Sequence, residues 1–194
     1  MPTTQKTCLG SIIEVVDVAV TPWQLGNIFG PRVAIQVKGD AAGRMIKNAK
    51  HPLLVAGGNV LKEFVGDKLY IEFIVELLKA RDMPLIATGA SYKDFADRGL
   101  SPVQIMNAVE VVDRLRDSDW SVDGKGPHDL VVFAGLSYQY LSQLLSCIKH
   151  FATHLRTLCL DRYYHPNADL SFPNLTEDQW MENLKLLLDN ARLR

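Results

Sequence analysis

The sequence predicts an α/β protein, a Rossmann-like parallel sheet with helices on both faces. Three segments carry one pattern, in which a short apolar run ends at a glycine: residues 50–59, 83–91 and 128–137. A fully apolar run of this length is typical of a parallel strand buried between two helical layers. A fourth run, residues 155–162, ends at Asp161 instead of a glycine. Four buried strands, mostly followed by helices, therefore define the expected architecture.

Length and composition restrict the class of protein. The chain has 194 residues and a net charge of -1, which suits one well-buried domain and gives no reason to expect a nucleic-acid partner. No apolar run approaches the roughly 20 residues that cross a bilayer, and the first residues do not resemble a secretory signal. Cys8, Cys147 and Cys159 are isolated, so we expect reduced thiols and no metal site. These features predict a cytoplasmic protein that does not bind a membrane.

Residues 1–38 do not share the strand-and-helix pattern and are predicted to form an N-terminal arm. Glycine and proline are too frequent there for a long helix, and residues 33–37 alternate as in a strand. Two interpretations remain open. The arm lies across the protein's own helices, or it wraps a partner subunit, since apolar residues such as Ile12 and Trp23 would not be left in water. Residues 39–194 are predicted to form a single Rossmann-like α/β domain.

The first two predicted helices flank the first strand. Asp40 suits a helix cap, and the apolar spacing continues to Ala49. After the first strand, a helix is predicted from Gly66 to about Arg81. Its apolar residues cover most of its circumference, so it should be buried on more than one side. One side is the sheet, and the other meets a neighbouring helix, the arm or a second chain. We expect one side of this helix, together with the arm, to belong to the partner surface.

The remaining elements follow from capping patterns and turn residues. Residues 88–99 are expected to form a polar loop, and Ser101 to cap a helix with Ile105 and Val109 on its inward face. Residues 120–127 form a turn-rich connection to the third strand. Ser137 is placed to cap the next helix, and residues 162–175 look irregular. Thr176 and Gln179 have the spacing of a capping box that opens the last helix.

The candidate binding site lies at the carboxyl ends of the predicted strands, where parallel sheets of this type bind ligands. Small residues there allow close approach of a diphosphate, Asp161 can bond to ribose hydroxyls, and Arg162 can balance a phosphate. The glycines can equally serve tight turns alone, because residues 57–59 lack the third glycine of the dinucleotide fingerprint. The candidate cofactor-binding residues are Gly57, Gly58, Asn59, Thr88, Gly89, Ser91, Gly135, Leu136, Ser137, Asp161 and Arg162.

No catalytic residue is predicted. Ser137 stands between a strand and a helix, but the sequence lacks the glycine two residues later that a nucleophile elbow needs. Asp161 and His165 are close in sequence, yet nothing connects them to a nucleophile.

Several motifs, taken together, resemble one family. The first two are residues 49–57 and 83–91. The third is Asp123-Gly-Lys-Gly126 followed by residues 129–135. The fourth is residues 160–164 followed by Asn167-Ala168 and Ser171-Phe172. As a set they resemble the epsilon subunit of the archaeal acetyl-CoA decarbonylase/synthase (carbon monoxide dehydrogenase) complex, from about residue 40 to the C-terminus. The resemblance implies a fold similar to the FAD- or NAD-binding middle domain of thiamine-dependent enzymes. That fold has a six-stranded sheet, so two further strands should lie in residues 11–37 or in the loops.

The resemblance also implies a role. Epsilon subunits are understood to pair two-plus-two with the nickel–iron alpha subunit of carbon monoxide dehydrogenase, and to dock FAD for electron transfer. The expected role is thus a non-catalytic subunit that docks FAD weakly or only within the complex. The oligomeric state of the isolated chain stays open, with a homo-oligomer as one alternative. The alternative is a free-standing NAD- or FAD-dependent oxidoreductase.

Overall fold

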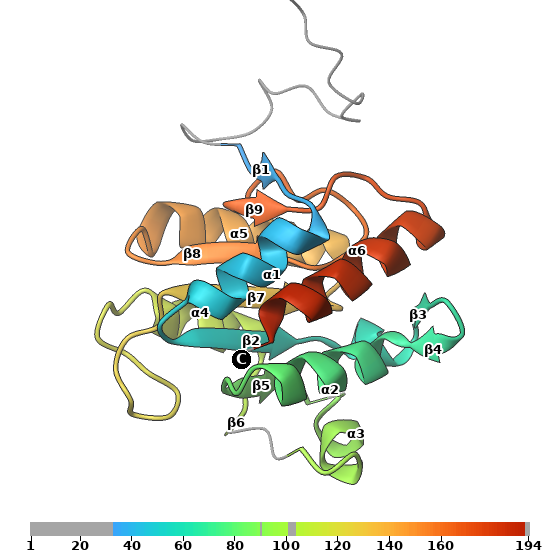
Figure 1. Ribbon diagram of the computed structural model, residues 1–194. Coiled ribbons are helices and arrows are strands. Elements are labelled where there is room, and N and C mark those ends of the chain that lie inside the picture. Colours follow the sequence, from blue (N-terminus) through green and yellow to red (C-terminus); the bar gives the residue numbers. More distant parts are fainter. Residues whose placement is uncertain (1–32, 90, 101–103, 193–194) are drawn as a thin grey trace, which may run out of the picture.

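A seven-stranded parallel sheet forms the centre of the protein, with helices on both faces (Figure 1). The structure is a computed structural model and describes residues 33–89, 91–100 and 104–192. The strand order is β1-β9-β8-β7-β2-β5-β6, and every pair in it is parallel. The strands are β1 (Ile35–Gln36), β2 (Pro52–Ala56), β5 (Leu85–Ala87), β6 (Gln104–Ile105), β7 (Leu130–Ala134), β8 (Arg156–Cys159) and β9 (Leu170–Ser171).

Two helical layers bury the sheet. The helices are α1 (Gly39–Asn48), the short 3-10 helix η2 (Gly58–Leu61), α2 (Tyr70–Ala80), α3 (Tyr92–Asp97), α4 (Ala108–Leu115), α5 (Tyr138–Phe151) and α6 (Glu177–Ala191). Helices α1, α2 and α6 share one core cluster with Leu54 and Ala56 of β2. Helices α4 and α5 share the other with Leu53 and Val55. The alternating side chains of β2 therefore serve both layers, which explains its unbroken apolar run.

The strand order confirms the predicted fold class. Without β1, the strands in chain order are arranged 3-2-1-4-5-6, the order of dinucleotide-binding Rossmann folds. The order reverses between β2 and β7, which places the topological switch point at their carboxyl ends. The four predicted strands are all present. The sheet has three further strands, whereas the six-stranded fold implied two.

The additional strands lie where the sequence signal was weak. Strand β1 falls within the predicted alternation of residues 33–37. Strand β9 lies in the segment 162–175, which was wrongly expected to be irregular. Strand β6 replaces the predicted start of a helix, and Asn107 caps α4 instead by accepting from the Glu110 N–H. As a result Ile105 and Val109 are exposed rather than inward-facing, and Ser101 lies outside the described residues.

Three other predicted boundaries were wrong. Helix α2 begins at Tyr70, because residues before it form an antiparallel hairpin of β3 (Phe64–Val65) and β4 (Lys68–Leu69). Gly66 has a φ of 62° in that turn, a conformation that glycine adopts without strain. Lys38 is the N-cap residue of α1, and Asp40 lies in its first turn. The expected polar loop at 88–99 contains helix α3.

The last two long helices agree with the prediction. The expected inward residues of α5 are all buried: Leu141, Leu144, Leu145, Ile148 and the adjoining Ala152. Thr176 and Gln179 form the complete capping box at the start of α6.

Helix α2 is buried on more than one side, as expected, but within its own chain. Its large apolar side chains all belong to the core cluster shared with the sheet, α1 and α6. None of them is among the exposed large apolar residues of the described chain. The prediction that one side of α2 offers an apolar surface to a partner is therefore wrong, because α6 covers it.

The last residues of the predicted arm belong to the sheet. The Ile35 N–H donates to the Asp169 carbonyl (2.9 Å), the Val37 N–H donates to the Ser171 carbonyl (3.0 Å), and the Tyr164 hydroxyl donates to the Ala34 carbonyl (2.6 Å). Residues 1–32, including Ile12 and Trp23, lie outside the described residues. The division into an arm and a domain stays a prediction.

Candidate functional site at the carboxyl end of the sheet

A cleft of about 510 Å³ opens beyond the carboxyl ends of β7 and β8. Its walls come from η2, the β3-β4 hairpin, the loops after β7 and β8, and the first turns of α5 and α6. The lining residues are Asn59, Glu63, Phe64, Leu136, Tyr138, Asp161, Arg162, Tyr163, His165, Glu177 and Trp180. The site therefore lies next to the switch point, where the fold class predicts a ligand.

Asp161 is the most perturbed acid in the cleft. Its Oδ1 accepts a 2.8 Å hydrogen bond from the Gly135 N–H, whereas its buried Oδ2 has no hydrogen-bond partner among the described residues. Burial raises the pKa of Asp161 to about 7, the Gly135 hydrogen bond opposes this shift, and the nearby Glu63 adds to it. Near neutral pH the carboxyl group therefore exists in both protonation states.

The glycines of the loops after β2 and β7 pack backbone against backbone. The Gly57 N–H donates to the Ala134 carbonyl (2.8 Å), and the Asn59 N–H donates to the Gly135 carbonyl (2.9 Å). A Cβ atom at Gly57 would lie 2.3 Å from the Gly135 oxygen. Gly135 has a φ of 66°, and a Cβ atom there would lie 2.3 Å from Val60 Cγ1. These contacts favour the interpretation that the glycines serve tight turns.

The structure brings only part of the predicted set together. Asn59, Leu136, Asp161 and Arg162 line the cleft. Gly57 and Gly135 do not line it but lie next to lining residues, since a Cβ at Gly57 would meet Leu136 and the Gly135 N–H donates to Asp161. Gly58 begins η2, and the exposed Ser137 is the N-cap of α5 without a side-chain cap hydrogen bond to any described residue. The residues after β5 do not line the cleft: Thr88 and Gly89 lie beside their own strand, and the buried Ser91 hydroxyl donates to the Thr88 carbonyl (3.2 Å).

Arg162 is already engaged within the chain. Its guanidinium bonds to Glu177 Oε1 (2.7 Å) and the Tyr163 hydroxyl (2.6 Å). The same group lies 4.9 Å from the centre of the Tyr163 ring. The cation predicted to balance a phosphate is thus balanced by a carboxylate.

His165 and Trp180 line the cleft. From the sequence, His165 belongs to an aromatic and polar cluster, residues 163–167, that suits an interface or a ligand rim, but it is not among the candidate cofactor-binding residues, and Trp180 was missed. The His165 ring stacks on Tyr138 with 4.4 Å between ring centres, and burial lowers its pKa to about 4, so it is neutral at pH 7. Its buried Nδ1 has no hydrogen-bond partner among the described residues. Trp180 donates from Nε1 to the Leu160 carbonyl (2.9 Å), which fixes its ring. Only tertiary packing brings α6 to this edge, so no local pattern indicated Trp180.

Part of the backbone that was predicted to hold the diphosphate of FAD is already used within the chain, and the FAD site stays a prediction. A diphosphate at such a loop needs free backbone N–H groups and an excess of positive charge. Here the N–H groups of Gly57, Asn59 and Gly135 are all donated within the chain. The cleft is lined by the carboxylates of Glu63, Asp161 and Glu177.

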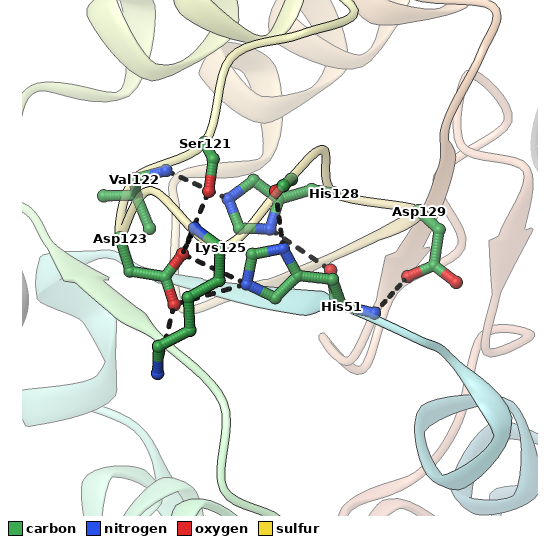
Figure 2. A network of polar contacts seen from close by, with 8 residues as sticks. His51, Ser121, Val122, Asp123, Lys125, His128 and Asp129 are labelled. Carbon is green, nitrogen blue, oxygen red and sulfur yellow. Dashed lines mark hydrogen bonds and ion pairs between the residues drawn. The ribbon is translucent and has the colours of Figure 1, made fainter.

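A second polar cluster lies at the opposite, amino end of β2 and β7 (Figure 2). His51 Nδ1 is 2.7 Å from the Gly126 carbonyl, and its Nε2 is 3.2 Å from Asp123 Oδ1. The His51 and His128 rings stack at 4.2 Å. Asp129 accepts the backbone N–H of both Lys50 (2.7 Å) and His51 (2.9 Å). The cluster fixes the glycine-containing connection 120–127 against the start of β2.

The electrostatics of this cluster depend on Asp123. Burial raises the pKa of Asp123, but hydrogen bonds from the Lys125 N–H, the Ser121 hydroxyl and His51 outweigh that effect and lower the pKa to about 2. His128 accepts the Val122 N–H at Nε2 (3.2 Å), and burial lowers its pKa. Sequence reasoning treated the histidines as scattered. The sequence did contain one indication of this cluster, because two of the family motifs, 49–57 and 123–126, supply its residues.

The described residues contain neither a cluster of metal ligands nor a membrane-spanning helix. No group of three or more His, Cys, Asp or Glu side chains there is arranged to hold a metal ion. Cys147 and Cys159 are free thiols, and Cys8 lies outside the described residues. No helix in the described part of the chain is both long and apolar enough to span a bilayer.

Strand order and cleft position define a Rossmann-like α/β protein with its candidate site at the carboxyl edge of the sheet. The chain belongs to the family described as CO dehydrogenase beta subunit/acetyl-CoA synthase epsilon subunit, whose model matches residues 16–188. This finding confirms the resemblance that the sequence motifs indicated.

Curated relatives agree with the family match. The chain is 37% identical over 172 residues to the acetyl-CoA decarbonylase/synthase complex subunit epsilon of Methanothermobacter thermautotrophicus, covering 88% of this chain and 96% of the relative. It is 37% identical to subunit epsilon 1 of Archaeoglobus fulgidus, covering 87% and 90%. It is 31% identical to subunit epsilon 1 of Methanosarcina barkeri, covering 86% and 94%.

Proposed function

We propose that this chain is the epsilon subunit of an acetyl-CoA decarbonylase/synthase complex and acts there as an accessory, non-catalytic subunit. The observation that carries the proposal is the family match over residues 16–188, together with relatives of nearly the same length that bear this subunit's name. The partner in the proposal is the nickel–iron alpha subunit of carbon monoxide dehydrogenase, in a two-plus-two assembly that the epsilon subunit stabilises.

The surface proposed to meet the partner is the edge formed by β1 and the preceding arm. Ile35 on β1 is 66% exposed, and Val33 next to it is 36% exposed. β1 is an edge strand, and apolar side chains on an edge strand are a common place for another chain to bind. Helix α2 is excluded from this surface because its apolar side chains are buried.

Co-expression with the alpha subunit tests the proposal. We expect the two chains to co-purify, and Ile35→Lys to weaken the assembly without unfolding the chain. Val109→Lys, at an exposed apolar position on α4, is the matched control and should assemble normally. NAD- or FAD-dependent redox turnover by the purified chain alone would instead support the free-standing oxidoreductase.

We propose that flavin binds at the subunit interface rather than on the glycine loops of this chain. The reason is that the N–H groups of Gly57, Asn59 and Gly135 in those loops are already donated within the chain. Titration of FAD with the isolated chain should leave its fluorescence unchanged, whereas the assembled complex should quench it. If the isolated chain quenches FAD fluorescence as strongly as the complex does, the flavin site lies on this chain.

A further inference from the structure

The carboxyl-end cleft contains two deeply buried polar side chains with an unused atom each. Asp161 is 7% exposed and His165 is 1% exposed. Asp161 Oδ2 and His165 Nδ1 both lack a hydrogen-bond partner among the described residues. Leaving a buried polar atom unpaired costs about 1–3 kcal/mol, and more for a charged group. The ionised Asp161 Oδ2 can only accept a hydrogen bond, whereas His165 Nδ1 accepts or donates one according to the tautomer of the ring. Two such atoms in the lining of one cleft indicate a polar ligand, and Asp161 indicates one that supplies a polar hydrogen.

The charges of the cleft determine which kind of ligand fits. Three carboxylates line it, those of Glu63, Asp161 and Glu177, and Arg162 already bonds to Glu177. Glu63 is half-buried, and burial raises its pKa although Arg162 acts in the opposite direction. This excess of carboxylate repels a phosphate and attracts a positive charge.

The apolar walls of the cleft favour a cation that carries an organic body. Phe64 and Tyr163 are 59% and 50% exposed at the cleft, and the Trp180 ring lies deeper. Aromatic faces attract organic ammonium and guanidinium groups. The Tyr163 face already holds the Arg162 guanidinium at 4.9 Å, which shows that these walls accept such a group.

We propose that the cleft binds an organic cation, an ammonium or guanidinium group on an apolar body, which donates a hydrogen bond to Asp161 Oδ2. The cation is either a free small molecule or a lysine or arginine side chain of a partner subunit, and both share this chemistry. The proposal depends on the cleft alone, so it can fail or succeed independently of the proposed function.

Calorimetric titration of the isolated full-length chain at pH 8, where Asp161 is ionised, tests the proposal. The probes are benzylamine as the cation, benzyl alcohol as its neutral analogue of similar shape, and ADP as a diphosphate. We expect benzylamine to bind at least tenfold more tightly than benzyl alcohol, and ADP not to bind. Equal binding of the first two probes, undetectable binding of benzylamine, or tighter binding of ADP would overturn the proposal.

Two variants locate the binding. Asp161→Asn keeps an oxygen that can accept the Gly135 N–H but removes the charge, so it should weaken benzylamine binding tenfold or more. Asp189→Asn makes the same change at an exposed position of α6 outside the cleft, and it should bind as the wild type does. Glu63→Gln should weaken binding by a smaller factor. Unchanged binding by both cleft variants would contradict the proposal.

Repeating the titration with the assembled complex distinguishes the two sources of the cation. If a partner's lysine or arginine fills the cleft, benzylamine binding is lost on assembly. If the natural ligand is a free small molecule, binding persists in the complex.

Discussion

The backbone N–H of Gly135 donates a 2.8 Å hydrogen bond to Oδ1 of Asp161 and so joins the end of β7 to the end of β8. This bond lies in the turn at Gly135, where φ is 66°, a conformation that favours glycine. One glycine therefore positions the acid of the cleft and also allows the loop after β2 to approach.

Gly135→Ala should destabilise the protein more than a positive φ alone explains. An alanine Cβ would lie 2.3 Å from Val60 Cγ1 and 2.6 Å from the Val60 backbone nitrogen. Conformational strain and overpacking together should lower the free energy of unfolding by about 2–4 kcal/mol in denaturant titrations. Gly124→Ala is the control, because its φ is 71° and a Cβ would meet no described atom within 4 Å. It should lose only about 1–2 kcal/mol, and equal losses would show that the Val60 contact is harmless.

Asp161→Asn should stabilise the unliganded protein at alkaline pH. The folded-state pKa of Asp161 is raised to about 7, so folding is penalised once the group ionises, and the penalty grows as pH rises from about 4 to 7. Glu63 lines the same cleft and adds to the penalty, while Tyr70 and Cys159 nearby have raised pKa values and stay neutral. The variant should exceed the wild type in free energy of unfolding by a few kcal/mol (roughly 2–4) at pH 8. The two proteins should become similar near pH 4, and a difference independent of pH would contradict this prediction.

The sequence identifies the centre of the sheet because β2, β5 and β7 are apolar runs bounded by proline or glycine. The two-residue strands β6 and β9 carry no such signal. They form where neighbouring strands supply hydrogen bonds, as when Ser171 pairs with both Gln36 and Cys159. Strands of two residues depend on tertiary pairing with their neighbours, so a local pattern cannot predict them.

The candidate site was only partly predictable for the same reason. Asp161 was predicted because it follows a buried strand directly. Glu63 comes from the approach to the hairpin and Trp180 from the last helix, so their convergence needs the complete fold. At the amino end, His51 and Asp123 are 72 residues apart in sequence, and only the pairing of β2 with β7 brings them into contact.

Asp123→Asn should remove an acid-dependent part of the stability. The folded-state pKa of Asp123 is lowered to about 2, so its ionised form stabilises the fold at any pH above its ordinary value of 3.8. That contribution is lost as pH falls from about 4 through 2. Wild type should therefore be more stable than the variant at pH 7, and the gap should narrow as pH falls toward 2. Exposed Asp67→Asn, on the β3-β4 hairpin, is the control and should follow the wild-type curve. If the difference in free energy of unfolding between the two proteins stays constant as pH falls, the charge of Asp123 does not contribute to stability.

Two truncations separate the sheet role of β1 from the proposed partner role of the arm. Deleting residues 1–30 retains β1 and should leave the free energy of unfolding unchanged within about 1 kcal/mol, because the β1–β9 hydrogen bonds remain. Deleting residues 1–37 removes the bonds that join residues 34–37 to the segment 164–171, and also the burial of Ala34 and Val37. Each hydrogen bond contributes about 0.5–1.5 kcal/mol, so this variant should lose about 2–5 kcal/mol of its free energy of unfolding in denaturant titrations.

Co-purification with the alpha subunit is the second measurement on the two truncated chains. The shorter deletion should weaken assembly while the chain stays folded. If it prevents folding instead, the arm belongs to the core, and if it assembles normally, the arm does not bind the partner.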